Sequence, residues 1–222
     1  MNQTPVTEVH NADLLDIIPW GASKLIEVGC GSGALAREFK KISPGCHYLG
    51  VEINPSYAEM AGRYCDQSQV LDIETADDTF WKANADRDCW IFGDTLEHLR
   101  DPWSVLRQVR QVIPSKGCIA ACIPNAQHWS VQARLSIGDF RYEDTGLLDR
   151  THLRFFSRQT ILEMFNDTGF TVTACIPRIF VEPMRERFLP AIEQFARLLG
   201  ADPKTSVDDA IPFQYVVSVV PR

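Results

Sequence analysis

The stretch from Leu25 to Gly33, LIEVGCGSG, constrains the fold of this chain more than any other. An apolar run predicts a buried parallel strand, alternating glycines follow it, and a helical pattern begins at Ala34. Glycine lets a backbone turn sharply and approach a ligand closely, and a helix start offers unpaired N–H groups. Gly29, Gly31 and Ala34 also fit the dinucleotide fingerprint G-x-G-x-x-A. The stretch therefore predicts a nucleotide-binding strand–turn–helix unit.

Three acidic residues fall at or near the ends of predicted strands. Glu27 lies two residues before the first glycine, Glu52 ends the second apolar run, and Asp72 ends the third. Ligands of open α/β sheets bind outside the carboxyl ends of the strands, where an acid at the second strand can accept ribose hydroxyls. Close packing of strand against helix is the alternative explanation of the glycines.

Strand and helix patterns alternate along the chain, which predicts an α/β fold with a mainly parallel sheet and helices on both faces. We expect one domain over residues 1–222, with a helical segment at 1–20, an acceptor-side insertion at 125–157 and a helical insertion at 182–212. The expected strands are 25–28, 46–51, 69–73, 88–92, 118–124, 170–176 and 213–220.

Composition limits the classes of partner. The net charge of −7 argues against a bulk nucleic acid or an anionic membrane as partner, since both attract basic surfaces. No apolar run reaches membrane-spanning length, and the first residues do not resemble a signal peptide. Seven cysteines without paired C-x-x-C spacing fit a reducing compartment. We therefore expect a cytoplasmic protein.

The E-x-G-x-G turn and the acid at Glu52 resemble those of class I S-adenosylmethionine (SAM) dependent methyltransferases. The resemblance extends through Val70–Ile73 and Asp94–Pro102 to the last strand. It implies seven strands in a Rossmann-like sheet, an antiparallel last strand, and SAM as cofactor. The cofactor contacts that it implies are Glu27, Gly29, Cys30, Gly31, Gly33 and Gly93 at the methionine part, Glu52 at the ribose, Asp72 at the adenine amine, and Ile53 and Ile73 around the adenine ring. The thiol of Cys30 has no chemical role in this interpretation and is expected to fill space.

The segment Leu147–Ser157 resembles a methyltransferase subgroup that is found with, or fused to, sugar-transferring enzymes. It implies a small polar acceptor, such as a hydroxyl of a sugar or a glycosylated metabolite. Aromatic faces with a few fixed polar groups suit such rings. The expected acceptor residues are Trp129, Tyr142, Arg150 and Arg154, with His128 nearby. A structural network between Asp149 and the arginines is the alternative explanation of the polar residues in this segment.

Asp94, Glu97 and His98 have the spacing i, i+3 and i+4, which would place them on one face of a helix. His98 is the preferred general base because the pKa of histidine lies near neutrality, and His152 is second. A divalent cation bound by Asp94, Glu97 and His98 is the alternative, as in some relatives with an E-x-x-E-H pattern. Aspartate replaces the first glutamate here, so we favour the metal-free version. An ordinary solvated helix face would also explain the pattern.

Two other functions share the glycine turn and the ribose acid. One is a Rossmann-type NAD(P)-dependent oxidoreductase, which the position of Glu27 and the lack of a separate substrate domain disfavour. The other is a SAM-binding regulator without catalysis, which the polar cluster after the fourth strand disfavours. The amphipathic pattern at 182–199 predicts a helix that either covers the acceptor site or forms a homodimer contact.

Overall fold

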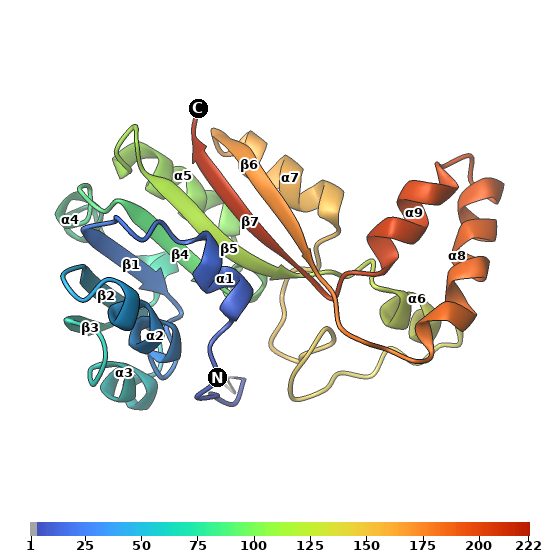
Figure 1. Ribbon diagram of the computed structural model, residues 1–222, viewed down its shortest axis with the longest axis horizontal. Helices are drawn as coiled ribbons and strands as arrows, with labels where there is room; N and C mark the ends of the chain where they lie inside the picture. Colours follow the sequence, from blue (N-terminus) through green and yellow to red (C-terminus); the bar gives the residue numbers. More distant parts are fainter. Residues whose placement is uncertain (1–3) are drawn as a thin grey trace.

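A seven-stranded sheet with the order β3-β2-β1-β4-β5-β7-β6 forms the centre of the computed structural model, which describes residues 4–222 (Figure 1). Strands β1 to β5 pair in parallel, and β7 runs antiparallel to both β5 and β6. The predicted mostly parallel sheet with an antiparallel last strand is therefore confirmed. The strands are β1 (Lys24–Val28), β2 (His47–Glu52), β3 (Gln67–Val70), β4 (Cys89–Gly93), β5 (Cys118–Pro124), β6 (Phe170–Arg178) and β7 (Gln214–Pro221).

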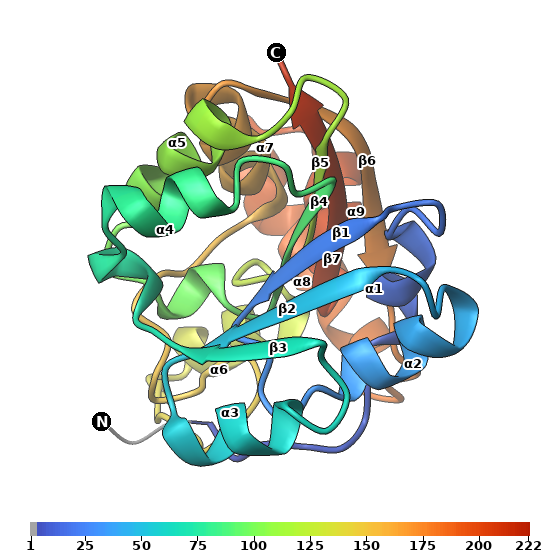
Figure 2. The same ribbon diagram turned by 90° about the vertical axis from the view of Figure 1, so that its left-hand side faces the viewer.

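Helices cover both faces of this sheet (Figures 1 and 2). Successive side chains of a strand point to opposite faces, so Leu25 of β1 belongs to one apolar core and Ile26 to the other. The core around Leu25 is covered by α1 (Ala12–Ile17), α2 (Ala34–Ile42) and α3 (Pro55–Ala61). The core around Ile26 is covered by α4 (Asp78–Ala83), α5 (Pro102–Val112) and α7 (Arg158–Asp167).

Local capping signals fix where several helices begin. The side chain of Asn54 accepts a hydrogen bond from the backbone N–H of Ser56 at the start of α3. At the start of α5, the side chain of Asp101 accepts one from the N–H of Ser104. Proline follows each cap, where its missing N–H costs nothing. Ser157 forms a capping box at α7. These short-range signals fix the starts of α3, α5 and α7.

Helices α6 (Trp129–Ser136), α8 (Arg185–Leu198) and α9 (Pro203–Ala210) stand together beyond one end of the sheet (Figure 1). Helix α6 follows β5, whereas α8 and α9 connect β6 to β7. Asn125 joins the two connections: its backbone N–H donates to Phe213 O at 3.0 Å, and its side-chain amide donates to Asp209 O and Pro212 O, each at 2.8 Å. The group therefore lies at the edge where the parallel strands end.

Several predicted boundaries are wrong. Strand β3 ends at Val70, so Asp72 lies beyond it and caps a short 3₁₀ helix (Ile73–Thr75). The N-terminal segment predicted as helical contains α1 at Ala12–Ile17, and residues 1–3 of it lie outside the described residues. Within 4–222, no helix is long and apolar enough to cross a membrane.

Candidate active site

The glycine turn connects β1 to α2 through backbone conformations that side chains rarely adopt. The φ angles are 74° at Gly29, 53° at Gly31 and 78° at Gly33. A Cβ at Gly29 would lie 2.5 Å from Thr95 Oγ1, and one at Gly33 would lie 2.9 Å from Ala61 Cα. Close packing is therefore part of the reason for the first and third glycines.

Glu52 connects the glycine turn to the start of α3. Its carboxylate accepts hydrogen bonds from the backbone N–H groups of Gly31 and Asn54, each at 2.9 Å. The side chain is largely buried at the end of β2. These contacts hold the carboxylate at the sheet edge where the ribose contact was predicted.

Glu27 is a buried acid inside the sheet, on β1. The hydroxyl of Tyr48, on β2, donates a hydrogen bond to its carboxyl group at 2.8 Å. Burial raises the pKa of Glu27 to about 8, the Tyr48 hydrogen bond lowers it, and the nearby charge of Glu52 raises it. A cationic group beside Glu27 would stabilise the charged carboxylate.

Two further predicted cofactor residues have close packing neighbours. Cys30 is buried, and a Cβ added at Gly50 would lie 2.7 Å from its sulfur, which agrees with a space-filling thiol. Gly93 ends β4, and a Cβ there would lie 3.0 Å from Leu14 Cδ2 of α1. A larger residue at Gly93 would therefore press on α1.

The predicted adenine contacts differ in exposure. Asp72 accepts a hydrogen bond from the N–H of Glu74 at 3.0 Å and forms an ion pair with Arg100 at 3.5 Å. Ile73 is buried in the core, whereas Ile53 is 45% exposed. Contacts of these residues with adenine stay predictions.

The N-terminal segment lies across the glycine turn, a contact that the sequence did not predict. The hydroxyl of Ser32 donates to Thr7 O at 2.8 Å, and a Cβ at Gly31 would lie 3.3 Å from Val6 Cγ2. The hydroxyl of Thr4 donates to Asp149 Oδ2 at 2.8 Å. The segment thus connects the glycine turn to the loop before α7.

The helix predicted over Asp94 to His98 is wrong. Asp94 has a φ of 53°, and only Leu96–His98 forms a single 3₁₀ turn. The left-handed residue turns the chain, so the carboxylate of Asp94 accepts a hydrogen bond from the side chain of Gln214 on β7. Asp94 does not join the other two residues as a common ligand group.

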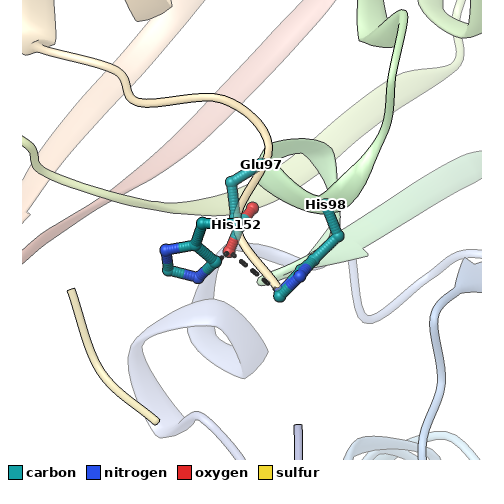
Figure 3. A group of neighbouring side chains, drawn as sticks. All are labelled: Glu97, His98 and His152. Carbon is teal, nitrogen blue, oxygen red and sulfur yellow. Dashed lines mark ion pairs between the residues drawn. The ribbon is translucent and has the colours of Figure 1, made fainter. Parts of the chain in front are cut away.

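His152 takes the place predicted for Asp94 (Figure 3). The Nε2 atoms of His98 and His152 each lie 4.0 Å from Glu97 Oε1. The Nδ1 atom of His98 lies 3.2 Å from Thr151 O, and that of His152 lies 3.3 Å from Leu147 O. Both carbonyl contacts need the hydrogen on Nδ1, so the Nε2 lone pairs face the carboxyl group. The two predicted bases therefore meet at one acid.

Backbone contacts bring these distant segments together. The N–H groups of Leu153 and Arg154 both donate to Glu97 O at 2.9 Å. The guanidinium of Arg154 donates to Arg100 O at 3.1 Å. Arg154, a predicted acceptor residue, thus holds the loop in place.

The cluster is strongly desolvated. Glu97 is 1% exposed, and neither carboxyl oxygen has a hydrogen-bond partner within the described part of the chain. Burial, followed by the nearby charge of Asp94, raises the pKa of Glu97 well above its usual range. Burial lowers the pKa of His98, and burial together with the neighbouring His98 lowers that of His152 to about 4. These directions favour neutral side chains at neutral pH.

The other predicted acceptor residues do not form one group. The indole N–H of Trp129 donates to Glu182 at 2.7 Å, His128 Nε2 lies 3.1 Å from the same oxygen, and the Trp129 ring stacks on Phe188 of α8 at 5.3 Å. Glu182 precedes α8 rather than belonging to it, which corrects the predicted helix start. The sequence carried no signal for its pairing with α6.

Tyr142 and Arg150 lie on the loop between α6 and α7, and both are exposed. Arg150 pairs with Asp144 at 2.7 Å. A row of aromatic contacts leads from Tyr142 to the cluster: Tyr142 to Phe140 at 6.0 Å, Phe140 to Phe155 at 6.0 Å, and Phe155 to His152 at 6.2 Å. The loop therefore places aromatic faces beside the histidines.

A family model described as a methyltransferase domain matches residues 13–174, which include the glycine turn, β1 to β5 and the Glu97–His152 cluster. The chain belongs to this methyltransferase family. The match decides against the oxidoreductase interpretation and for a methyltransferase.

Solved structures share the fold of this methyltransferase at low sequence identity. A proposed SAM-dependent methyltransferase from Listeria monocytogenes has a TM-score of 0.63 and 13% identity, over 95% of this chain and 96% of its own. A Thermotoga maritima protein, described as a possible histamine N-methyltransferase, has a TM-score of 0.61 and 15% identity, over 94% of this chain and 86% of its own. An O-methyltransferase of neocarzinostatin biosynthesis, in complex with S-adenosylhomocysteine and a dihydroxynaphthoic acid, has a TM-score of 0.58 and 13% identity, over 95% of this chain and 53% of its own.

A curated relative matches a shorter stretch. A protein of Bifidobacterium longum, named a probable polyamine aminopropyl transferase, is 28% identical over 85 residues, which span 38% of this chain and 19% of that protein. The chain therefore spans about a fifth of the length of that relative.

Proposed function

We propose that this methyltransferase transfers the methyl group of S-adenosyl-L-methionine to a hydroxyl of a small polar acceptor, with sugars and glycosylated metabolites as the acceptor class. The observation that carries the proposal is the position of the Glu97–His98–His152 cluster, which follows the strand next to the glycine turn and borders the aromatic row of the 138–156 loop.

The proposed cofactor contacts lie at the edge of the sheet where the parallel strands end. Glu52 accepts the ribose hydroxyls, Glu27 faces the cationic methionine end, and the glycine turn allows close backbone approach. Asp72 accepts a hydrogen bond from the adenine amine, and Ile53 and Ile73 contact the adenine ring. Gly93 lies near the methionine carboxylate. The buried acids suit this ligand in kind, because SAM has a cationic group for Glu27 and hydroxyl donors for Glu52.

The bound cofactor supplies a methyl group already activated on a sulfonium sulfur. The chain therefore has to align the acceptor oxygen with that methyl group, exclude water and remove one proton. A hydroxyl benefits from a proton acceptor at this step, whereas a neutral amine needs only to be positioned. Two neutral imidazoles with Nε2 lone pairs facing the site supply that acceptor, and we assign the proton to the cluster as a whole.

The loop and α6 form the acceptor side in this proposal. Tyr142, Phe140 and Phe155 offer aromatic faces, and the exposed guanidinium of Arg150 offers hydrogen-bond donors. Trp129 forms the far wall with α8. The resemblance of Leu147–Ser157 to a subgroup found with sugar-transferring enzymes supports the hydroxyl of a sugar over that of a phenol as the acceptor.

Product analysis by mass spectrometry tests the proposal. The protein is incubated with SAM carrying a deuterated methyl group and with sugar nucleotides, glycosides, phenols and amines in parallel. Labelled methyl on the oxygen of a sugar or glycoside supports the proposal. Labelling of only amines, a protein or a nucleic acid would overturn the acceptor class. Loss of product in Glu52→Ala, but not in the control Glu59→Ala, which alters an exposed residue of α3, would tie turnover to the cofactor site.

A further inference from the structure

We infer that Glu97, His98 and His152 bind a divalent transition-metal cation, through one carboxylate and two imidazole Nε2 atoms. One ligand atom from each residue lies within 4.8 Å of the others (Figure 3). The set differs from the one expected from sequence, because His152 replaces Asp94.

The hydrogen-bonding groups of the cluster are arranged to receive a cation. Both imidazoles use Nδ1–H to donate to backbone carbonyls, so each Nε2 presents only a lone pair. These lone pairs face a carboxyl group whose two oxygens have no partner within the described residues. When Glu97 is ionised, as a metal ligand must be, three acceptors converge without a donor among them, and a cation in place of the carboxyl proton would satisfy all three.

The distances favour a cation over a shared proton. Each Nε2 lies 4.0 Å from Glu97 Oε1, beyond hydrogen-bond range. Ligand atoms about 2.0–2.2 Å from a tetrahedral metal lie roughly 3.4 Å apart. Small side-chain rotations would therefore close the three atoms around one ion.

The surrounding contacts fix the tautomer and the ring orientation of both histidines as metal binding requires. Histidine ligands usually donate their second ring N–H to a carbonyl or carboxylate, which fixes tautomer and orientation. Thr151 extends this support: its hydroxyl lies 3.1 Å from His98 Nδ1 and donates to Asp149 Oδ1 at 2.7 Å. Asp149 and Leu147 O thus anchor both histidines from outside the cluster.

The donor set selects the class of metal. Imidazole nitrogen suits zinc, copper, iron or nickel, whereas magnesium, calcium and manganese prefer oxygen ligands. Three protein ligands leave a coordination position open, and the side chain of His98 is 27% exposed, so that position can be reached. An ion there would occupy both Nε2 lone pairs, so the imidazoles would no longer accept the proton; the ion would instead polarise the acceptor hydroxyl and ease release of its proton to solvent. This role in turnover rests on the proposed function, whereas cation binding does not.

Cobalt binding tests the site without an activity assay. The tag-free protein is treated with chelator, desalted and titrated with Co²⁺, and visible absorption and the thermal unfolding midpoint are recorded. We expect one Co²⁺ per chain, ligand-field bands and a higher Tm. Glu97→Gln and His98→Gln should weaken Co²⁺ binding by at least about tenfold, since loss of mere outer contacts costs about 10–100-fold.

The controls separate this site from general histidine binding. His10→Gln alters a histidine outside the cluster and should bind Co²⁺ as the parent does. A tenfold excess of Mg²⁺ should not displace Co²⁺. Equal Co²⁺ affinity in the parent and in folded Glu97→Gln and His98→Gln would overturn the site, and displacement by Mg²⁺ would overturn the metal class. If no cation binds but sugar hydroxyls are methylated, only this inference fails. Cation binding without such products means that only the proposed function fails.

Discussion

The hydroxyl of Tyr48 donates a hydrogen bond of 2.8 Å to the carboxyl group of Glu27, between two neighbouring parallel strands. Burial outweighs this contact and raises the pKa of Glu27 to about 8. The folded protein therefore binds more protons than the unfolded chain between the two pKa values, so this group makes the free protein less stable as pH rises from 4.5 towards 8.

The same shift predicts that cofactor binding releases a proton. The cationic methionine end would lower the pKa of Glu27, so SAM affinity should increase with pH up to about 8. Calorimetry at pH 7 in buffers of different ionisation enthalpy measures the released protons. Glu27→Gln should abolish the release, and Tyr48→Phe should move the increase to higher pH, because the hydrogen bond lowers the pKa. A pH-independent affinity in the parent would contradict this placement of Glu27.

Glu52→Ala should weaken SAM binding several-fold or more while the protein stays folded. The substitution removes the predicted ribose acceptor and the carboxylate that accepts the N–H groups of Gly31 and Asn54. Fluorescence titration with SAM measures the change in Kd, and circular dichroism checks the fold. Unchanged affinity in Glu52→Ala would show that the ribose assignment is wrong.

Gly29→Ala should destabilise the protein more than Gly138→Ala does. Both glycines have positive φ, 74° and 76°, so both substitutions cost about 1–2 kcal/mol of backbone strain. Only Gly29 also has Thr95 Oγ1 2.5 Å from an added Cβ, whereas Gly138 has open space. Denaturant unfolding measures both changes. Equal losses would mean that contact with Thr95 does not matter, and Thr95→Ala should partly rescue Gly29→Ala.

His98→Ala should lower kcat by about 10²–10⁴-fold with little change in SAM affinity, because a proton acceptor contributes about that much. If an ion is bound, Glu97→Gln and His152→Ala should be comparably damaging, and a chelator should remove activity. If His98 acts alone as a base, those changes should be milder and chelator harmless. Asp94→Asn is the matched control, since Asp94 contacts Gln214 instead. Full activity in His98→Ala would show that His98 takes no part in catalysis and has only a structural role.

The exposed apolar end of α8 should mediate self-association. Phe195, Leu198 and Leu199 are 61%, 75% and 82% exposed at the end of α8, whereas Phe188, nearer its start, stacks on Trp129 of α6. Apolar side chains clustered on a surface favour contact with a partner. Sedimentation should show a dimer that Leu198→Lys weakens. If the unsubstituted protein stays monomeric at high concentration, the prediction is wrong and α8 only packs on α6.

The sequence by itself determined the elements whose signals are local. The glycine turn and the strand–helix alternation depend on residues within a few positions of each other, and their predicted places agree with the structure. The caps at Asn54, Asp101 and Ser157 are local signals of the same kind. The strand-end positions of Glu27 and Glu52 follow from the same patterns.

Only the tertiary structure decided which polar side chains meet. Asp94 turns away because one left-handed residue replaces the expected helix, and His152 arrives because two backbone N–H groups of its loop bind the carbonyl of Glu97. Glu182 likewise reaches Trp129 and His128 from a connection far along the chain. Contacts between residues far apart in the sequence depend on the loop conformations that the folded chain adopts. No short-range sequence pattern specifies those conformations.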